Sequence, residues 1–506
     1  MKKYFLKAQK IYSFDPYFNT YSWILVENNK IIDLGNESLP SETNIPIYNF
    51  EEGFILPGFI DSHVHFSSTA IRDILLDLSN LSSLKEIIKA LEALRDSMPE
   101  GEWIIAKEFD PENIEEKTNI TKKDLDKYFP KHPVLIIRKD AHSSIINTMG
   151  EKILNLDLSY SEGEILTGKD HQIVVGKVYQ NIEPSLLVKG ILKILKKSAE
   201  KGVTTIHALE GGYTSPPNTP QILLGLKQYF PIDVLIYYQT TSIKKVKELG
   251  LNQIGGCLLV DGSVSSMTAA LSKPYIVDKE NYGVLYWDLD TLTNFIRSAH
   301  NENLQIAFHA VGDRGIDLLL KAYKKVFKDY PKKDHRHRIE HFELPKNEHI
   351  KMVAELELML SLQPSFLYFW GGEGKLYEEF LGKERSKRII PLKSIIEHNI
   401  IAGGGSDSSV TPIDPFLGIY SAVNHPNPEE SISIKDAIKM FTFNSAYIGF
   451  LNNEKGSIEK NKIADLVILD RDPLNIDPKD IIDIKVIATI CKGKFVYKNP
   501  SYDFNE

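Results

Sequence analysis

Cysteine is scarce in this sequence: Cys257 and Cys491 are the two cysteines among 506 residues. Two thiols exclude the disulfide framework on which small secreted proteins depend, and they fit a reducing compartment. Long apolar runs are also missing, because no uninterrupted stretch reaches the ~18 residues that a membrane-spanning helix needs. The segment before Lys10 has no apolar run of signal-peptide length. We therefore expect a cytoplasmic protein with no membrane partner.

Positive charge is not in excess either. The chain has 60 lysines and arginines against 68 aspartates and glutamates, which gives a formal net charge of −8. Nucleic acids and anionic membranes are bound by basic surfaces, so this balance argues against both as partners. The 42% share of hydrophobic residues and the 25% share of charged residues are typical of a globular protein. The length is sufficient for a large buried core.

The most informative segment is residues 53–65, an apolar run that ends in a His-X-His motif. Side chains alternate between the faces of a strand and rise by ~3.3 Å per residue. Asp61, His63 and His65 therefore share one face, and both imidazoles can bind one metal ion. Three more strand-like segments end in a potential metal ligand: His309, His341 and Asp407. Together these endings predict one shared pocket.

Strand-like and helix-like segments alternate through the middle of the chain. The predicted helices cover residues 184–201, 290–301 and 315–328. The predicted strands are residues 53–65, 133–138, 203–207, 257–262, 305–309, 338–341, 360–363 and 400–407. Eight strands that alternate with helices indicate a (β/α)8 TIM-like barrel, an α/β fold whose active site lies at the carboxyl ends of the strands.

Short strands and turns dominate both ends of the chain. Residues 23–27 and 31–35 flank an Asn-Asn-Lys turn and are typical of a hairpin. Neither end has enough apolar surface to fold alone. We therefore expect residues 1–56 and 453–506 to form one composite β-sandwich domain beside a catalytic barrel of residues 57–452.

The stretch at about 70–180 is longer than one strand–helix unit of a barrel needs. Ser83 and Glu86 form a capping box, which predicts that a helix begins there and continues to about Ser97. We interpret this stretch as an insertion in the barrel that is partly helical.

Several of these segments resemble motifs of the amidohydrolase superfamily, in particular of its YtcJ-like (amidohydrolase 3) branch. The segments that carry the resemblance are residues 56–65, 308–313, 338–341, 405–412 and 462–470. They follow the order in which the family has them and are spread over nearly the whole chain. The resemblance implies a metal-dependent hydrolase barrel with a small β-sandwich domain built from both termini.

The resemblance also implies roles for individual side chains. His63 and His65 would be ligands of one metal ion, and His309 and His341 would bind a second ion or complete the first site. Asp407 would bind metal and accept the proton of the attacking water. Any one of these histidines taken alone could instead be a core or surface residue. Asp407 could also cap the helix that follows it.

Imidazole and carboxylate ligands suit Zn²⁺, with Fe, Mn or Co as alternatives. A divalent metal lowers the pKa of bound water from 15.7 to about 7, which supplies hydroxide at neutral pH. We therefore expect a hydrolase that cleaves a non-peptide C–N bond, an amide or N-acyl group, of a small-molecule substrate. A lactone, a cyclic amide or a phosphoester stays open as the substrate of the same site.

Cys257 departs from the family pattern, because the family often has at this position a carboxylated lysine that bridges two metal ions. Cysteine cannot form that carbamate. Its thiolate is a good Zn²⁺ ligand at ~2.3 Å, but the side chain is much shorter. The alternative is a small buried hydrophobic residue. The sequence therefore favours one firmly held ion over two.

Six further polar residues lie at strand ends or in loops and are candidates for substrate binding: Asp110, Asp140, His142, His207, Asp261 and Gln363. Asp140 and His142 resemble the family's Asp-Gly-His, and His207 stands where the family tends to have histidine. For Asp140 and His142 the alternative is a structural hydrogen bond that organises a loop.

A protein of another class would keep the barrel for binding or assembly and lack catalysis. The absence of the bridging lysine favours that alternative. Such relatives usually lose the metal-binding histidines as well, whereas this sequence keeps them, so an enzyme is favoured. The resemblance also leaves a homodimer open.

Overall fold

The computed structural model describes residues 3–39, 44–139, 143–156, 165–212, 215–331, 333–502 and 504. The chain divides into two compact units, each described here by itself. The first unit comprises Met1–Phe66, Leu195–Glu210 and Pro220–Glu506, and the second comprises Ser67–Ile194 and Gly211–Thr219. No helix in the described part of the chain is both long and apolar enough to cross a membrane.

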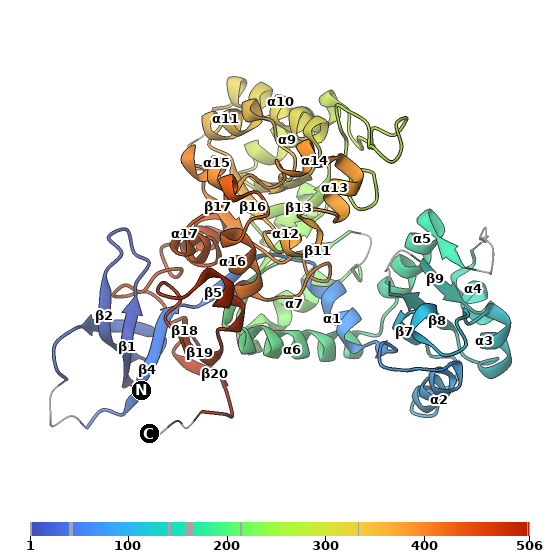
Figure 1. Ribbon diagram of the computed structural model, residues 1–506, viewed down its shortest axis with the longest axis horizontal. Coiled ribbons are helices and arrows are strands. Elements are labelled where there is room, and N and C mark those ends of the chain that lie inside the picture. Colours follow the sequence, from blue (N-terminus) through green and yellow to red (C-terminus); the bar gives the residue numbers. More distant parts are fainter. Residues whose placement is uncertain are drawn as a thin grey trace. The chain divides into compact units, whose positions relative to one another are not determined.

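The centre of the first unit is a parallel eight-stranded sheet whose strand order follows the chain (Figure 1). Its strands are β5 (Phe59–Val64), β11 (Val203–Gly211), β12 (Asp233–Gln239), β13 (Gln253–Leu259), β14 (Gln305–Ala310), β15 (Arg338–His341), β16 (Met359–Leu362) and β17 (Ala402–Gly404). These strands are almost entirely buried, as expected for a parallel sheet covered on both faces. The expected barrel fold is confirmed.

The barrel closes between its first and last strands. The amide of Asp407 donates to the carbonyl of His63 at 2.8 Å, and the amide of His65 donates to the carbonyl of Ser408 at 2.7 Å. The seam thus pairs the His-X-His motif with the loop that directly follows β17.

Helices lie between the barrel strands and after the last of them. They are α6 (Pro184–Glu200), α7 (Thr219–Leu226), α8 (Ile243–Glu248), α9 (Leu289–Asn301), α10 (Asp313–Asp329), α11 (Asn347–Glu355), α12 (Ser365–Trp370), α13 (Leu376–Leu381), α14 (Lys383–Ser386), α15 (Leu392–Glu397), α16 (Pro415–Val423), α17 (Ile434–Lys439) and α18 (Ser445–Ile448). The helices predicted at residues 184–201, 290–301 and 315–328 correspond to α6, α9 and α10, with bounds within two residues.

One predicted barrel strand is wrong. Residues 133–138 do form a strand, β8 (Val134–Arg138), but it belongs to a separate sheet in the second unit. The barrel strand missing from the prediction is β12. A short buried apolar run has the same pattern in any sheet, so periodicity alone cannot decide which sheet it joins.

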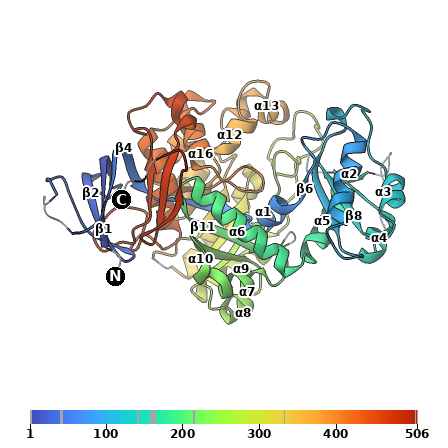
Figure 2. The ribbon, with the colours of Figure 1, turned by 90° about the horizontal axis from the view of Figure 1, so that it is seen from below.

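Strands from both ends of the chain form one seven-stranded sheet, in the order β20-β19-β18-β4-β1-β2-β3. The strands are β1 (Lys3–Tyr12), β2 (Thr20–Glu27), β3 (Lys30–Gly35), β4 (Ile47–Pro57), β18 (Leu466–Leu469), β19 (Val486–Cys491) and β20 (Lys494–Lys498). The antiparallel pair β4–β18 joins the two ends, and both views show the blue and red strands side by side (Figures 1 and 2). The hairpin β2–β3 is confirmed, whereas the domain boundaries stay a prediction.

The predicted first strand is divided between these two sheets. β4 ends at Pro57 in the terminal sheet, and β5 begins at Phe59 in the barrel. A Cβ atom on Gly58, between them, would lie 2.3 Å from Cγ2 of Thr204, so only glycine fits this passage.

The second unit contains a five-stranded sheet in the order β10-β9-β8-β7-β6. Its other elements are α1 (Phe66–Ile74, which begins in the first unit), β6 (Leu76–Asp77), α2 (Leu84–Arg95), β7 (Ile104–Phe109), α3 (Lys122–Tyr128), β9 (Ser143–Ile146), α4 (Thr148–Leu154), β10 (Leu166–Thr167) and α5 (Gly168–Gln180). The hydroxyl of Ser83 accepts from the amide of Glu86 and caps α2, which confirms the predicted start of that helix.

A buried lysine links the barrel to the terminal sheet. Lys455 is 3% exposed, and its ammonium donates to Asp233 of β12 at 2.5 Å and to Asp465, just before β18, at 2.6 Å. It also donates to the hydroxyl of Thr205 in β11 at 3.1 Å. A buried charge is tolerated only when it is paired and hydrogen-bonded. The Lys455 ammonium meets both conditions, because it pairs with Asp233 and Asp465 and also donates to Thr205.

Lys455→Met should therefore lower the free energy of unfolding by about 3–5 kcal/mol, because it leaves the buried Asp465 carboxylate without its counterion. The measurement is denaturant unfolding of both proteins. Lys460→Met is the matched control, since Lys460 pairs with Asp33 in solvent at 2.7 Å and such pairs contribute at most about 1 kcal/mol. Equal losses in the two variants would contradict the role given to Lys455.

Candidate metal centre

Six potential metal ligands lie at or just beyond the carboxyl ends of barrel strands. They are His63 in β5, His65 just after it, Cys257 in β13, His309 in β14, His341 in β15 and Asp407 after β17. In a parallel barrel these ends face the same side, so residues that are far apart in the sequence meet there.

Asp407 lies between the two histidines of the His-X-His motif. Its Oδ1 atom is 3.2 Å from Nε2 of His63 and 3.0 Å from Nε2 of His65. His63 is fully buried, and Asp407 is 5% exposed. The ligand atoms of His63, His341 and Asp407 all lie within 4.8 Å of one another.

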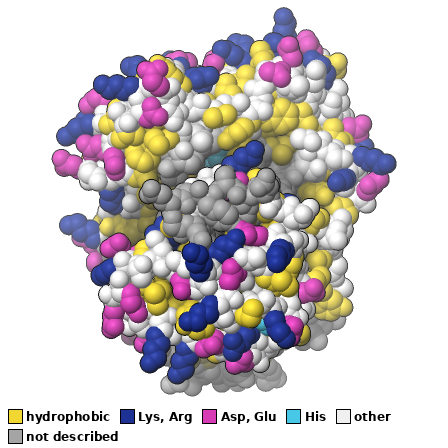
Figure 3. Space-filling view, turned by 90° about the vertical axis from the view of Figure 1, so that its right-hand side faces the viewer, with side chains coloured by type: hydrophobic (Ala, Val, Ile, Leu, Met, Phe, Trp, Pro, Cys, Tyr) yellow, Lys and Arg dark blue, Asp and Glu magenta, His cyan; other side chains and the backbone are white. Residues whose placement is uncertain are grey.

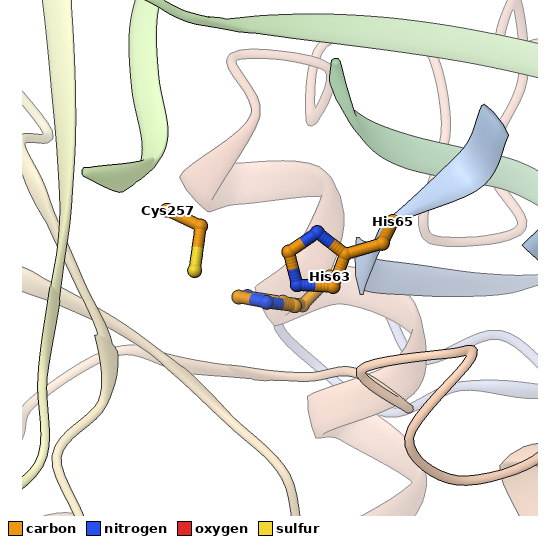
Figure 4. Close-up of side chains that lie close together, drawn as sticks. All are labelled: His63, His65 and Cys257. Atoms are coloured by element: carbon orange, nitrogen blue, oxygen red, sulfur yellow. The ribbon is translucent and has the colours of Figure 1, made fainter. Parts of the chain in front are cut away.

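Cys257 completes two further groups of ligands. Its sulfur lies within 4.8 Å of the nearest ring nitrogens of His63 and His65 in one group, and of His309 and His341 in the other. Figure 4 shows the Cys257 side chain directed toward the imidazoles of His63 and His65, which come from the end of β5. The distance from Cys257 Sγ to His309 Nδ1 is 3.5 Å. All the metal ligands predicted from the sequence are therefore brought together.

The outer ring nitrogens of two of these histidines already have partners. Nδ1 of His63 lies 2.7 Å from Oε2 of Glu340, and Nε2 of His309 lies 3.1 Å from the carbonyl of Gly262. Because a carbonyl can only accept, Nε2 of His309 carries a proton, and Nδ1 is the ring nitrogen that faces Cys257. Histidines that bind metals characteristically use the second ring nitrogen in this way.

The inner atoms lack hydrogen bonds. Among the described residues, Nε2 of His63, both ring nitrogens of His341 and Oδ1 of Asp407 are buried and make no hydrogen bond. Buried polar atoms of this kind are costly and demand an explanation. The convergence of imidazole, thiolate and carboxylate groups around these atoms fits a divalent transition-metal ion.

The pKa values of the side chains in the site follow from this crowding. Burial by itself would lower the pKa of each histidine, but Asp407 raises the pKa of His63 well above its usual range. Asp407 and Cys257 likewise raise the pKa of His65 to about 10 against the effect of burial. Burial would raise the pKa of Asp407, yet His63 and His65 hold it well below its usual range. The site thus favours the protonated forms of His63 and His65 and the ionised form of Asp407.

Backbone strain marks two of the candidate ligands. His341 has φ of 71° and Asp407 has φ of 57°, in the left-handed region that side chains other than glycine rarely adopt. Such strain persists where the surrounding structure enforces it, and it is common at functional sites.

The match with known sequences agrees with this geometry. The sequence model described as "Amidohydrolase family" matches residues 47–497. The chain belongs to the amidohydrolase family. This membership confirms the resemblance seen in the sequence and assigns the chain to the hydrolases.

Individual amidohydrolase relatives match over nearly their whole length. The putative amidohydrolase YtcJ of Bacillus subtilis is 28% identical over 482 residues, 88% of this chain and 89% of the relative. The N-substituted formamide deformylase of Arthrobacter pascens is 23% identical over 522 residues, 94% of each chain. An uncharacterized metal-dependent hydrolase from Pyrococcus furiosus, known from its crystal structure, has a TM-score of 0.80 and 25% identity over 94% of this chain and 100% of its own.

The predicted substrate-binding residues have varied surroundings. Asp261 is fully buried and accepts from the amides of Ala270, Val311 and Gly312, at 2.7–2.9 Å, so it holds the loop after His309. Gln363 is buried beyond β16, and its side-chain oxygen makes no hydrogen bond among the described residues.

Asp110 is in the second unit, where it accepts from the amide of Glu112. Asp140 and His142 lie outside the described residues. Substrate binding by any of the six candidates stays a prediction.

His207 contacts a side chain that the sequence did not single out. It is fully buried in β11, and its Nδ1 atom accepts from Arg338 at 3.0 Å. Arg338 in turn pairs with Glu340 at 2.7 Å. Both belong to the predicted strand that ends in His341, and their spacing of two places them on one face. A charged pair with this spacing in a buried strand was the signal available in the sequence.

One other cluster has the composition of a metal site. The ligand atoms of Asp233, Asp465 and Cys491 lie within 4.8 Å of one another. The ammonium of Lys455 already bonds both carboxylates. The Lys455 ammonium therefore already supplies the positive charge that a metal ion would bring to this cluster.

The molecular surface carries charge of both signs. On the face shown in Figure 3, basic and acidic side chains are interspersed, with apolar side chains between them. This distribution agrees with the net charge of −8.

Gly405 allows the barrel seam to close. A Cβ atom at this position would lie 2.7 Å from both the backbone nitrogen and Cβ of His63. Gly405→Ala should therefore displace His63 and lower turnover by about 10²-fold, the effect of a misplacement near 1 Å. Zinc binding measured by calorimetry should weaken in parallel. Gly225→Ala, where nothing lies within 4 Å of the added carbon, is the control and should match the unmodified protein.

Proposed function

We propose that this amidohydrolase is a metal-dependent enzyme that cleaves an amide or N-acyl C–N bond of a small molecule with activated water. The observation that carries the proposal is the convergence of imidazole, thiolate and carboxylate groups in which Nε2 of His63, both ring nitrogens of His341 and Oδ1 of Asp407 make no hydrogen bond among the described residues. Zn²⁺ is the ion favoured by this ligand set, since it accepts nitrogen, sulfur and oxygen ligands. Fe, Mn or Co stay as alternatives.

The residues that would hold the metal are those at the barrel mouth: His63, His65, His309, His341, Asp407 and Cys257. A divalent metal supplies two things when bound: it polarises a carbonyl oxygen and lowers the pKa of water. The geometry of His309 supports this role, because its outer nitrogen donates to Gly262 and its inner nitrogen faces the site.

Asp407 is the proposed general base. Its pKa is held well below the usual range by His63 and His65 despite burial, so the group is ionised at neutral pH. Water contributes its oxygen to the acyl carbon, and Asp407 transfers a water proton to the nitrogen as the C–N bond breaks. The products are a carboxylic acid and an amine.

The relatives support the choice of bond. The relative from Arthrobacter pascens is named an N-substituted formamide deformylase and aligns with 94% of this chain. Removal of a formyl group from nitrogen is the smallest case of N-acyl hydrolysis. A lactone, a cyclic amide or a phosphoester is the second candidate, because activation of water does not select the bond.

Asp407→Asn should lower turnover by at least ~10²-fold, as expected when a general base is lost. Turnover is measured with a panel of formamides, N-acyl amino acids, lactones and phosphotriesters. Asp414→Asn is the control, because Asp414 caps α16 and should leave turnover nearly unchanged. Near-normal activity of Asp407→Asn would remove Asp407 from this role, and turnover of lactones or phosphotriesters alone would contradict the C–N assignment.

Cys257 is the proposed thiolate ligand. Burial would raise the pKa of its thiol, but His309, His341 and His63 hold it well below the usual range. The same sulfur belongs to two of the three groups of ligands at the barrel mouth. We favour one firmly held ion.

Cys257→Ala should therefore weaken zinc binding by at least about 10-fold, because the only sulfur in the proposed ligand set is removed. Competition with a chromogenic chelator measures the affinity. The matched control is Cys491→Ala, which removes the other cysteine of the chain from its place beside Lys455. Unchanged affinity in Cys257→Ala would make this residue a packing residue.

A further inference from the structure

A fully buried ion pair lies directly behind the candidate metal ligands. Arg338 and Glu340 have no exposed surface. The guanidinium makes two parallel bonds to the carboxylate, Nε to Oε1 at 2.8 Å and Nη2 to Oε2 at 2.7 Å. Bidentate pairing of this kind fixes the plane of the carboxylate as well as its distance.

The Glu340 carboxylate also contacts a candidate ligand. Its Oε2 atom lies 2.7 Å from Nδ1 of His63, which is likewise fully buried. A carboxylate held by arginine accepts, so Nδ1 of His63 carries a proton, and Nε2 is the nitrogen whose lone pair a metal ion would take. Nε2 is the atom that faces Asp407 at 3.2 Å and has no hydrogen bond.

Arg338 is itself held from three further sides. Its Nη2 donates to the carbonyl of Ser62, next to His63, at 2.8 Å. Its Nη1 donates to Nδ1 of His207 at 3.0 Å, and its guanidinium lies 4.2 Å from the ring centroid of Tyr237. These contacts connect β5, β11, β12 and β15, so the position of the guanidinium is set by half of the barrel strands.

We propose that Glu340 is a positioning residue for the metal site, which fixes the tautomer and ring orientation of His63, and that Arg338 and His207 hold Glu340 in place. The inference rests on the proposed function, since it requires His63 to bind metal through Nε2. A buried ion pair seldom stabilises a fold more than apolar residues of the same size. The direct bond to His63 gives this pair a function that packing alone would not require.

Glu340→Gln tests the inference through metal affinity instead of turnover. Glutamine keeps an oxygen that can accept from His63 but removes the charge that polarises the ring and pairs with Arg338. Zinc affinity, measured by chelator competition, should weaken by about 10- to 100-fold, as for other residues that hold a metal-binding histidine. Asp334→Asn is the matched control: Asp334 also pairs with an arginine two residues away, Arg336, at 2.6 Å, and affinity should stay within about 2-fold.

The outcomes separate the two proposals. Failure of the unmodified protein to bind zinc would overturn the proposed function. Tight binding by the unmodified protein and equal binding by Glu340→Gln would overturn this inference and leave the proposed function intact. If Glu340→Gln does not fold, Arg338→Met combined with Glu340→Gln removes both buried charges, and the same loss of affinity is expected.

A second measurement needs no variant in the ion pair. In zinc-loaded protein with ¹⁵N-labelled histidine, the signal of His63 should show a proton on Nδ1 and a metal on Nε2. The signal is identified by its loss in His63→Asn. A proton on Nε2 would contradict the inference whatever the affinities are.

Discussion

The seam between β5 and β17 is the constraint on which the site depends. Two backbone hydrogen bonds, from Asp407 to His63 and from His65 to Ser408, close the barrel at the position of the His-X-His motif. The same pairing brings the Asp407 carboxylate within 3.2 Å of both imidazoles. Gly405 permits the close approach, because any larger residue would meet the backbone of His63. The hydrogen bonds that close the barrel therefore also bring the side chains of the site together.

Closure concentrates polar groups that the barrel interior does not otherwise satisfy. The inner atoms of His63, His341 and Asp407 lack hydrogen bonds among the described residues, whereas the outer nitrogens of His63 and His309 are bound to Glu340 and Gly262. The contrast indicates a directed arrangement at His63, whose Nδ1 is held by Glu340 while its Nε2 makes no hydrogen bond among the described residues. The neighbouring Cys257 raises the pKa of His309 to about 9 against the effect of burial, with a smaller contribution from Asp261.

Much of this architecture could be predicted from the sequence. Alternation of strands and helices gives the barrel, and the strand-end positions of the histidines and Asp407 place them together, since parallel strands share a common end. The sequence could not predict which sheet β8 and β12 join. Both are short apolar runs, and only their pairing with strands distant in the sequence assigns β8 to the second unit and β12 to the barrel. The pair Arg338 and Glu340 was visible as a spacing, but its contact with His63, 277 residues away, depends on the closed barrel. Asp261 was proposed for substrate binding, yet its three backbone partners emerge only once the loops are folded.

The most direct test of the account is the position of the metal in a crystal of zinc-loaded protein, located by anomalous scattering at the zinc absorption edge. The account predicts a peak about 2.0–2.3 Å from ring nitrogens of the His-X-His motif and from at least one further ligand among Cys257, His309, His341 and Asp407. A peak confined to the cluster of Asp233, Asp465 and Cys491, or no peak at the barrel mouth under metal-replete conditions, would contradict it.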